Sequence, residues 1–262
     1  MRKISVENCR RAAHRGFTLI EILVALLIGL FLLGALMAIV QSNRHAFFDQ
    51  NQLGQLHDSE RMAMSLMSDV IQSAGYFPDP TTNTSGVLIA APAPAPAPAF
   101  IVGQSITGAA GTAPPGGTGA SITVRYVTAP NDGILNCSGL SNTTAANIVY
   151  VNTFKVANGQ LVCTMNGTDF NLVSGIGNAT TTAGITNMKV LYGVKTNAAA
   201  PGNNVDTYLT ADLMTSTNWN SVISVVVTLT FTNPLYTGVG SQPASFDVTR
   251  TIGLMNQVGP TL

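Results

Sequence analysis

Few side chains in this sequence could carry out acid–base, nucleophilic or metal chemistry. The two histidines that follow residue 16, His45 and His57, are twelve positions apart on one helical segment. That spacing does not match the i, i+4 pair of a helical zinc site. No histidine follows His57, so a Ser-His-Asp or Cys-His site in the C-terminal region is excluded, and no hydrolase, P-loop or zincin motif occurs. We therefore predict that the chain is not an enzyme and holds no cofactor.

The carboxylates of the C-terminal region are scattered. The pairs Asp132-Gly133 and Asn166-Gly167 are typical of turns. Asp206 and Asp212 are near enough in sequence for a calcium site to stay open as an alternative, although we predict no metal site.

Charge is sparse and balanced in the whole chain. Only 9% of the residues are charged, and twelve basic and twelve acidic side chains cancel to a net charge of zero. This balance excludes the basic stripe typical of nucleic-acid binding, and an apolar content of 46% excludes a wholly disordered chain. The positive charge collects in residues 1–16, which contain four arginines and one lysine against Glu7.

An apolar segment, Phe17 to Val40, follows this basic leader with a single charge at Glu21. As a helix it spans about 36 Å, enough to cross a bilayer core of about 30 Å. The basic leader predicts a cytoplasmic N-terminus and an exported C-terminal region. A conventional cleaved signal peptide is the alternative, but its apolar region is about 7 to 15 residues long and its cleavage site lies beyond that region.

The string Gly16-Phe17-Thr18-Leu19-Ile20-Glu21 between the basic leader and the apolar helix resembles the class III signal of type IV pilins and pseudopilins. The resemblance implies cleavage between Gly16 and Phe17 by a prepilin peptidase, and N-methylation of the new Phe17 terminus. It also implies that Glu21 pairs with the terminal amine of a neighbouring subunit. Physical reasoning agrees, because a carboxylate and an amine buried in apolar surroundings each need a partner.

The segment after the apolar run keeps helical periodicity to Ala74, and Gly75 is a natural helix cap. Its strings SNRHAFF (42–48) and SERMAMSLMSDVIQSAGYF (59–77) resemble minor pilins of the PilW type. Residues 76–120 contain a Pro-Ala repeat, expected as a stiff polyproline II rod, and a Gly-rich stretch, expected as a loop.

Six segments after residue 120 have the composition of β-strands, with turn residues between them. They are 121–129, 146–156, 160–164, 187–195, 222–232 and 246–254. In 222–232 apolar and polar residues alternate, which predicts an antiparallel sheet with one buried face under the long helix. Asn158-Gly159 predicts a tight hairpin. Tyr192-Gly193 and Trp219 again resemble the PilW pattern.

Two cysteines remain once the leader, which contains Cys9, is removed. In an exported domain we expect Cys137 and Cys163 to form a disulfide, because the compartment is oxidising. The chain-entropy model gives such a bond about 3.5 kcal/mol of stabilisation.

These patterns predict an α+β, pilin-like chain in which a long N-terminal helix packs on an antiparallel β-sheet head. The expected parts are a cleaved leader (1–16), a transmembrane and polymerisation helix (17–40), an amphipathic half of the same helix (41–75), a Pro/Ala/Gly-rich loop (76–120) and a β-rich head (121–262).

The resemblance implies a structural minor pilin that takes part in pilus assembly or priming. Its partners would be the prepilin peptidase, other minor pilins, the major pilin, a tip adhesin and inner-membrane lipid. The expected location is the inner membrane, with one span and a periplasmic head, and then the pilus tip. Two alternatives stay open: a minor pseudopilin in the tip complex of a type II secretion system, and an adhesin or receptor subunit that binds through its loop.

Overall fold

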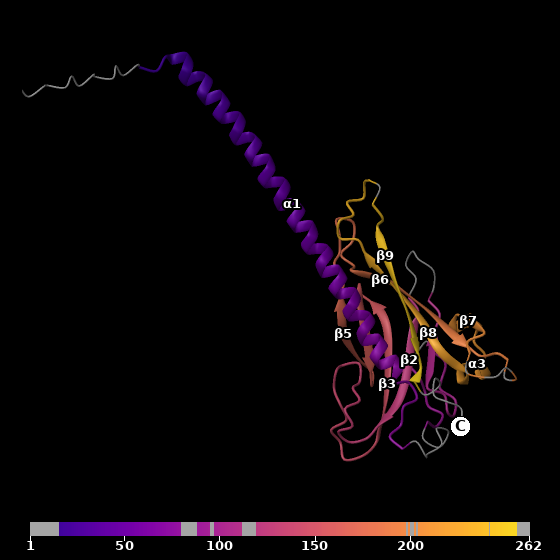
Figure 1. Ribbon diagram of the computed structural model, residues 1–262. Coiled ribbons are helices and arrows are strands. Elements are labelled where there is room, and N and C mark those ends of the chain that lie inside the picture. The colour runs from indigo at the N-terminus through magenta and orange to yellow at the C-terminus, as the bar shows by residue number, and fades with distance from the viewer. Residues whose placement is uncertain are drawn as a thin grey trace, which may run out of the picture. The chain divides into compact units, whose positions relative to one another are not determined.

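The computed structural model describes residues 16–79, 88–94, 97–111, 119–197, 199, 202, 204–240 and 242–255. The chain divides into two compact units, Met1–Gln50 and Asn51–Leu262. The division falls inside one helix, α1 (Leu19–Gln72), which is labelled in Figure 1. We describe each unit by itself.

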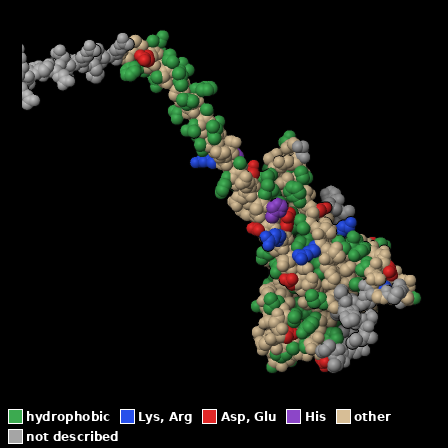
Figure 2. Space-filling model, viewed as in Figure 1, with side chains coloured by type: hydrophobic (Ala, Val, Ile, Leu, Met, Phe, Trp, Pro, Cys, Tyr) green, Lys and Arg blue, Asp and Glu red, His purple; other side chains and the backbone are tan. Residues whose placement is uncertain are grey.

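In the first unit α1 has no packing partner among the described residues. Every residue from Gly16 to Gln50 is exposed except Gly29, which is half-buried. Apolar side chains cover this part of the helix in Figure 2. It is the one described helix long and apolar enough to cross a membrane, with a mean hydropathy of 3.0 over its best window. The predicted apolar helix is confirmed.

In the second unit α1 buries a single stripe. Leu56, Ala63, Met67 and Ile71 are almost fully buried, while Asp58, Arg61 and Asp69 between them are exposed. The helix ends at Gln72 and the chain turns through Gly75, whose φ of +77° suits glycine. The expected amphipathic stripe and cap are therefore present, with the helix two residues shorter than the periodicity suggested.

The head contains two antiparallel sheets where the sequence analysis expected one. A five-stranded sheet has the order β1-β2-β3-β4-β5, and a four-stranded sheet has the order β7-β6-β8-β9. The strands of the first sheet are β1 (Ile106–Ala109), β2 (Ser121–Thr128), β3 (Ile148–Ala157), β4 (Gln160–Met165) and β5 (Thr168–Ser174). Those of the second are β6 (Ile185–Val194), β7 (Thr207–Leu209), β8 (Val222–Thr232) and β9 (Ser245–Gly253).

The six predicted strands correspond to β2, β3, β4, β6, β8 and β9. Strands β1, β5 and β7, and the short helices η1 (Ala211–Leu213) and α3 (Ser216–Asn220), were not predicted. β1 lies inside the segment expected as a loop. The hairpin turn at Asn158-Gly159 is confirmed, with φ values of +52° and +75°, and a second one joins β4 to β5 at Asn166-Gly167.

One apolar core joins the helix to both sheets. On β8 the alternating residues Val225, Val227, Leu229 and Phe231 are fully buried, as the alternation predicted. The single tryptophan, Trp219 of α3, closes one end of this core in an edge-to-face contact with Tyr192 at 4.8 Å.

Candidate functional site

The segment around Gly16 and Phe17 is accessible and non-helical. Both residues are exposed, and α1 begins two positions after Phe17, at Leu19. The carbonyl of Thr18 accepts the first helical hydrogen bonds, from the amides of Glu21 and Ile22 at 3.1 and 3.3 Å. The peptide bond between Gly16 and Phe17 therefore lies outside the hydrogen-bonded helix.

Glu21 is the acidic residue in the first turn of α1, where the helix dipole favours a negative charge. It follows Phe17 by four residues, and both side chains line the same side of the chain's start. A shallow groove of about 560 Å³ runs down this face past Ala25, Gly29 and Leu33. The small side chains of Ala25 and Gly29 leave room for another helix to approach closely.

This face combines the chemistry needed for helix–helix assembly. A carboxylate lies at one end, a groove of small residues follows it, and apolar side chains cover the remaining surface. In a bilayer or a fibre the Glu21 carboxylate needs a cationic partner, because an unpaired charge is costly in apolar surroundings.

The head holds the second predicted feature, the disulfide. Cys137 and Cys163 are bonded, with their Cα atoms 6.3 Å apart, so the expected pairing is present. The bond ties the loop before β3 to β4. The same loop is held by a hydrogen bond of 3.0 Å from the Cys137 amide to the Asn152 side-chain oxygen.

A buried cation, Arg125, is the residue that the sequence analysis missed. It lies in the middle of β2 with 2% of its surface exposed, and its guanidinium donates to four backbone carbonyls. The distances are 2.7 Å to Gln104, 2.6 Å to Ile89, 2.9 Å to Ile101 and 3.3 Å to Leu88. All four acceptors belong to the expected Pro/Ala/Gly-rich loop, so Arg125 fixes that segment to the outer face of the first sheet.

The segment fixed by Arg125 is consequently packed, not a free rod. Phe100 is 1% exposed and lies under the guanidinium, with 4.4 Å from its ring centre to Cζ. Leu88 is equally buried, and Ala91 pairs with Phe100 in a β-bridge. Burial lowers the pKa of Arg125 to about 10, which still leaves it charged at neutral pH. The Gly-rich residues 112–118 lie outside the described residues.

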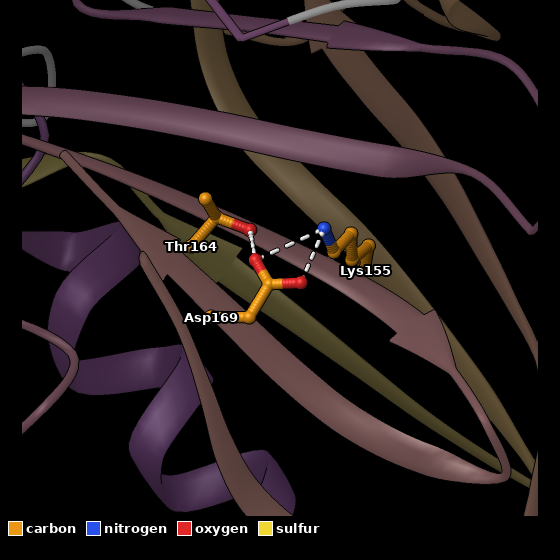
Figure 3. Close-up of polar contacts among 3 residues, drawn as sticks. All are labelled: Lys155, Thr164 and Asp169. Carbon is orange, nitrogen blue, oxygen red and sulfur yellow. Dashed lines mark hydrogen bonds and ion pairs between the residues drawn. The ribbon is translucent and has the colours of Figure 1, made fainter. Parts of the chain in front are cut away.

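Three polar side chains meet on the outer face of the first sheet (Figure 3). The Asp169 carboxylate accepts from the Thr164 hydroxyl and pairs with the Lys155 ammonium at 2.9 Å. These contacts, that of Thr164 first, lower the pKa of Asp169. The carboxylate is half exposed and is engaged by both partners, so it forms a cross-strand contact on the surface of the sheet.

The candidate calcium carboxylates are used differently or stay apart. The Asp206 carboxylate accepts hydrogen bonds of 2.9 Å from the amides of Asn197 and Thr196, which lower its pKa. Asp212 is an exposed residue of η1. In the part of the chain that the structure describes, no three His, Cys, Asp or Glu side chains cluster as metal ligands. His57 contacts Glu60 at 3.0 Å on α1.

With this geometry, the features of a type IV pilin are present: an exposed apolar helix with a carboxylate in its first turn, continued into an α+β head. Residues 11–37 match the model of the prokaryotic N-terminal methylation motif, and residues 148–256 match the model described as type IV pilus-assembly protein W. The chain thus carries a pilin methylation motif and a PilW domain, and its resemblance to PilW-type minor pilins is confirmed.

Among solved structures, a type IV-like pilin from Thermus thermophilus is similar at 10% sequence identity and a TM-score of 0.39. The similarity covers 77% of this chain and 98% of that one. No curated protein matches the chain. The α+β assignment rests on the helix and the two sheets themselves. The matched family is one of structural pilins, and the motif indicates prepilin peptidase processing, membrane anchoring and association with a pilus.

Proposed function

We propose that this protein is a minor subunit of a type IV pilus that takes part in priming or assembling the fibre at the inner membrane. Prepilin peptidase cuts between Gly16 and Phe17, and the new terminus is methylated. The apolar half of α1 holds the subunit in the membrane and then packs among the helices of neighbouring subunits, while the head is displayed in the periplasm and at the pilus tip.

The observation that carries this proposal is the exposure of the apolar side chains in the first unit. Its apolar side chains, such as Leu30 and Phe31, are 73% and 78% exposed with no packing partner among the described residues. Burying one such side chain contributes about 1.5–3 kcal/mol, so this helix must be covered by lipid or by other helices. Glu21, at the end of the small-residue groove, is the one charged residue of the apolar run 17–40, and it fixes how far one helix slides along another.

The first experiment measures the intact mass and N-terminal sequence of the protein from membranes, with and without the prepilin peptidase. We expect an N-methylated Phe17 terminus that depends on the peptidase. An intact Met1, or a cut beyond Val40, contradicts the proposal and favours a simple anchored or secreted head.

A second experiment isolates the assembly step. Glu21→Gln keeps the shape of the side chain but removes its charge, so we expect normal cleavage and a loss of the subunit from sheared pili. Asp49→Asn removes one negative charge from an exposed position further along α1 and serves as the matched control. Equal recovery of both variants in pili contradicts the role given to Glu21.

A further inference from the structure

The edge of the second sheet at β9 is unusually open. Strand β9 pairs with β8 over nine residues in continuous register, from Ser245 opposite Thr232 to Gly253 opposite Ser224. Among the described residues nothing pairs with its other edge. An edge of this kind presents a row of free backbone donors and acceptors.

The other three sheet edges are protected in ways that β9 is not. Strands β1 and β7 are only four and three residues long. Strand β5 carries a register irregularity in its pairing with β4, and its end is contacted by α1 through a hydrogen bond from Ser59 to the Ser174 carbonyl. Short strands, irregular pairing and a covering helix are the usual means of blocking strand addition. Strand β9 is nine residues long, pairs with β8 in continuous register and contains no proline.

A groove lies beside this open edge. It measures about 850 Å³ and runs between β9 and the second half of α1, with Met62 and Leu66 on the helix side and Val248 on the strand side. Val248 and Arg250 lie in rows of the sheet whose other members, such as Leu229 and Val227, are fully buried. The inner face of β9 thus continues the core but is left partly uncovered.

Two arginines without partners face this groove, one from each wall. Arg61 of α1 and Arg250 of β9 are exposed, and neither has a hydrogen bond or ion pair within the described residues. Two carboxylates of the same helix, Asp58 and Glu60, line the groove as well, and Glu60 is engaged by His57 at 3.0 Å. An occupant that places a carboxylate between the arginines gains two charge-assisted contacts.

We propose that the groove between α1 and β9 binds an extended segment of a different pilus subunit, which adds a strand to the open edge of β9. Alternate side chains of that segment cover Met62, Leu66 and Val248, and one carboxylate pairs with Arg61 and Arg250. A second copy of β9 is a poor occupant, because it would bring the unpaired arginines of both copies together in one groove. The proposal rests on the pilus function proposed above.

The test uses the full-length protein in cells that make pili, with a photo-reactive amino acid at Ser65 on the groove wall. The same label at Thr143, on an exposed loop of the head, is the negative control, and at Leu30 on the apolar helix it reports assembly itself. We expect the Ser65 label to crosslink to another pilus subunit, through a peptide that contains Asp or Glu. Arg250→Glu should reduce this product about tenfold.

Lys189→Glu is the matched control, since Lys189 is an exposed cation of the same sheet that lies outside the groove; we expect it to leave the product unchanged. Hydrogen exchange then tests strand addition: the amides of 245–253 should exchange more slowly in the isolated complex than in the free protein. Crosslinking without this protection overturns strand addition. A Ser65 product with a second copy, or crosslinks from Leu30 but not from Ser65, also overturn the proposal. If neither label crosslinks to a pilus subunit, the proposed pilus function fails as well.

Discussion

Replacing Arg125 by alanine tests how the head holds its Pro/Ala-rich segment. The guanidinium is the donor for four carbonyls, those of Leu88, Ile89, Ile101 and Gln104. A hydrogen bond to a charged group contributes about 1.5–3 kcal/mol, but the four are not additive, because carbonyls freed near the surface regain water. A buried carbonyl left without its donor costs about 1–3 kcal/mol, so with some of the four regaining water we expect Arg125→Ala to lower the free energy of unfolding by about 3–5 kcal/mol.

Two further variants separate the causes of this loss. Arg125→Lys keeps a charge but has no planar fork and only three donors, so it should restore about half of the stability. Lys189→Ala removes an exposed cation from the second sheet and should change the free energy of unfolding by less than about 0.5 kcal/mol.

Denaturant titration of the full-length protein in detergent measures these differences, with the buried Trp219 as the fluorescent probe of the core. Hydrogen exchange over residues 97–104 measures the local effect and should be faster in Arg125→Ala under native conditions. The reasoning is refuted if Arg125→Ala is as stable as Lys189→Ala, or if stability falls while exchange over this segment is unchanged.

Three other predictions follow from the head. Burial raises the pKa of Tyr126 and Tyr192, so both stay protonated above pH 10 while the protein is folded. The free energy of unfolding should therefore fall as pH rises past 10. Absorbance at 295 nm should show these two groups ionising only on unfolding. Reducing the disulfide of Cys137 should lower the free energy of unfolding by about 3.5 kcal/mol, and equal denaturation curves with and without reductant would contradict this. Gly54→Ala, on an open face of α1, should stabilise the folded protein by about 1 kcal/mol. Gly184→Ala places a Cβ against backbone and should destabilise it, and thermal unfolding of the two variants checks the sign of each change.

The parts of the fold with a strong local signal were predictable from sequence. The apolar run of α1 and the alternation in β8 each satisfy a single periodicity over many residues, so both were assigned correctly. Strands β1 and β7 are too short to show a periodicity. β7 is defined by its pairing with Tyr192, Gly193 and Val194 of β6.

The division into two sheets had no signature in the sequence. Gly175 and Gly184 approach so closely that a side chain on either would clash. Both belong to the connection that carries the chain from β5 to β6 in the other sheet. In the sequence, this close approach of two backbones is visible only as two glycines among the twenty-five of the chain. Nothing in their spacing indicates that they meet.

Arg125 was missed for a related reason. A single arginine in an apolar strand is usually an exposed or edge residue, since unpaired buried charge is unfavourable. Here its acceptors are backbone carbonyls up to 37 positions away, and backbone carbonyls occur in every residue and so leave no compositional trace. Phe100 was the one available signal, because an aromatic side chain at the end of a Pro-Ala repeat needs a surface on which to pack.

In the head, contacts between uncharged polar side chains accompany the sparse charge of the chain. Thr107, Thr123, Thr153 and Thr164 form one row across four neighbouring strands, and Asp169 ends that row on β5. Hydroxyl contacts, such as 2.8 Å between Thr123 and Thr153, take the place that ion pairs hold on more charged proteins. Such contacts are short and insensitive to salt, and they leave few charges on the surface. Two unpaired arginines that line one groove beside β9 stand out against this background, and their pairing in one place supports a partner at that edge.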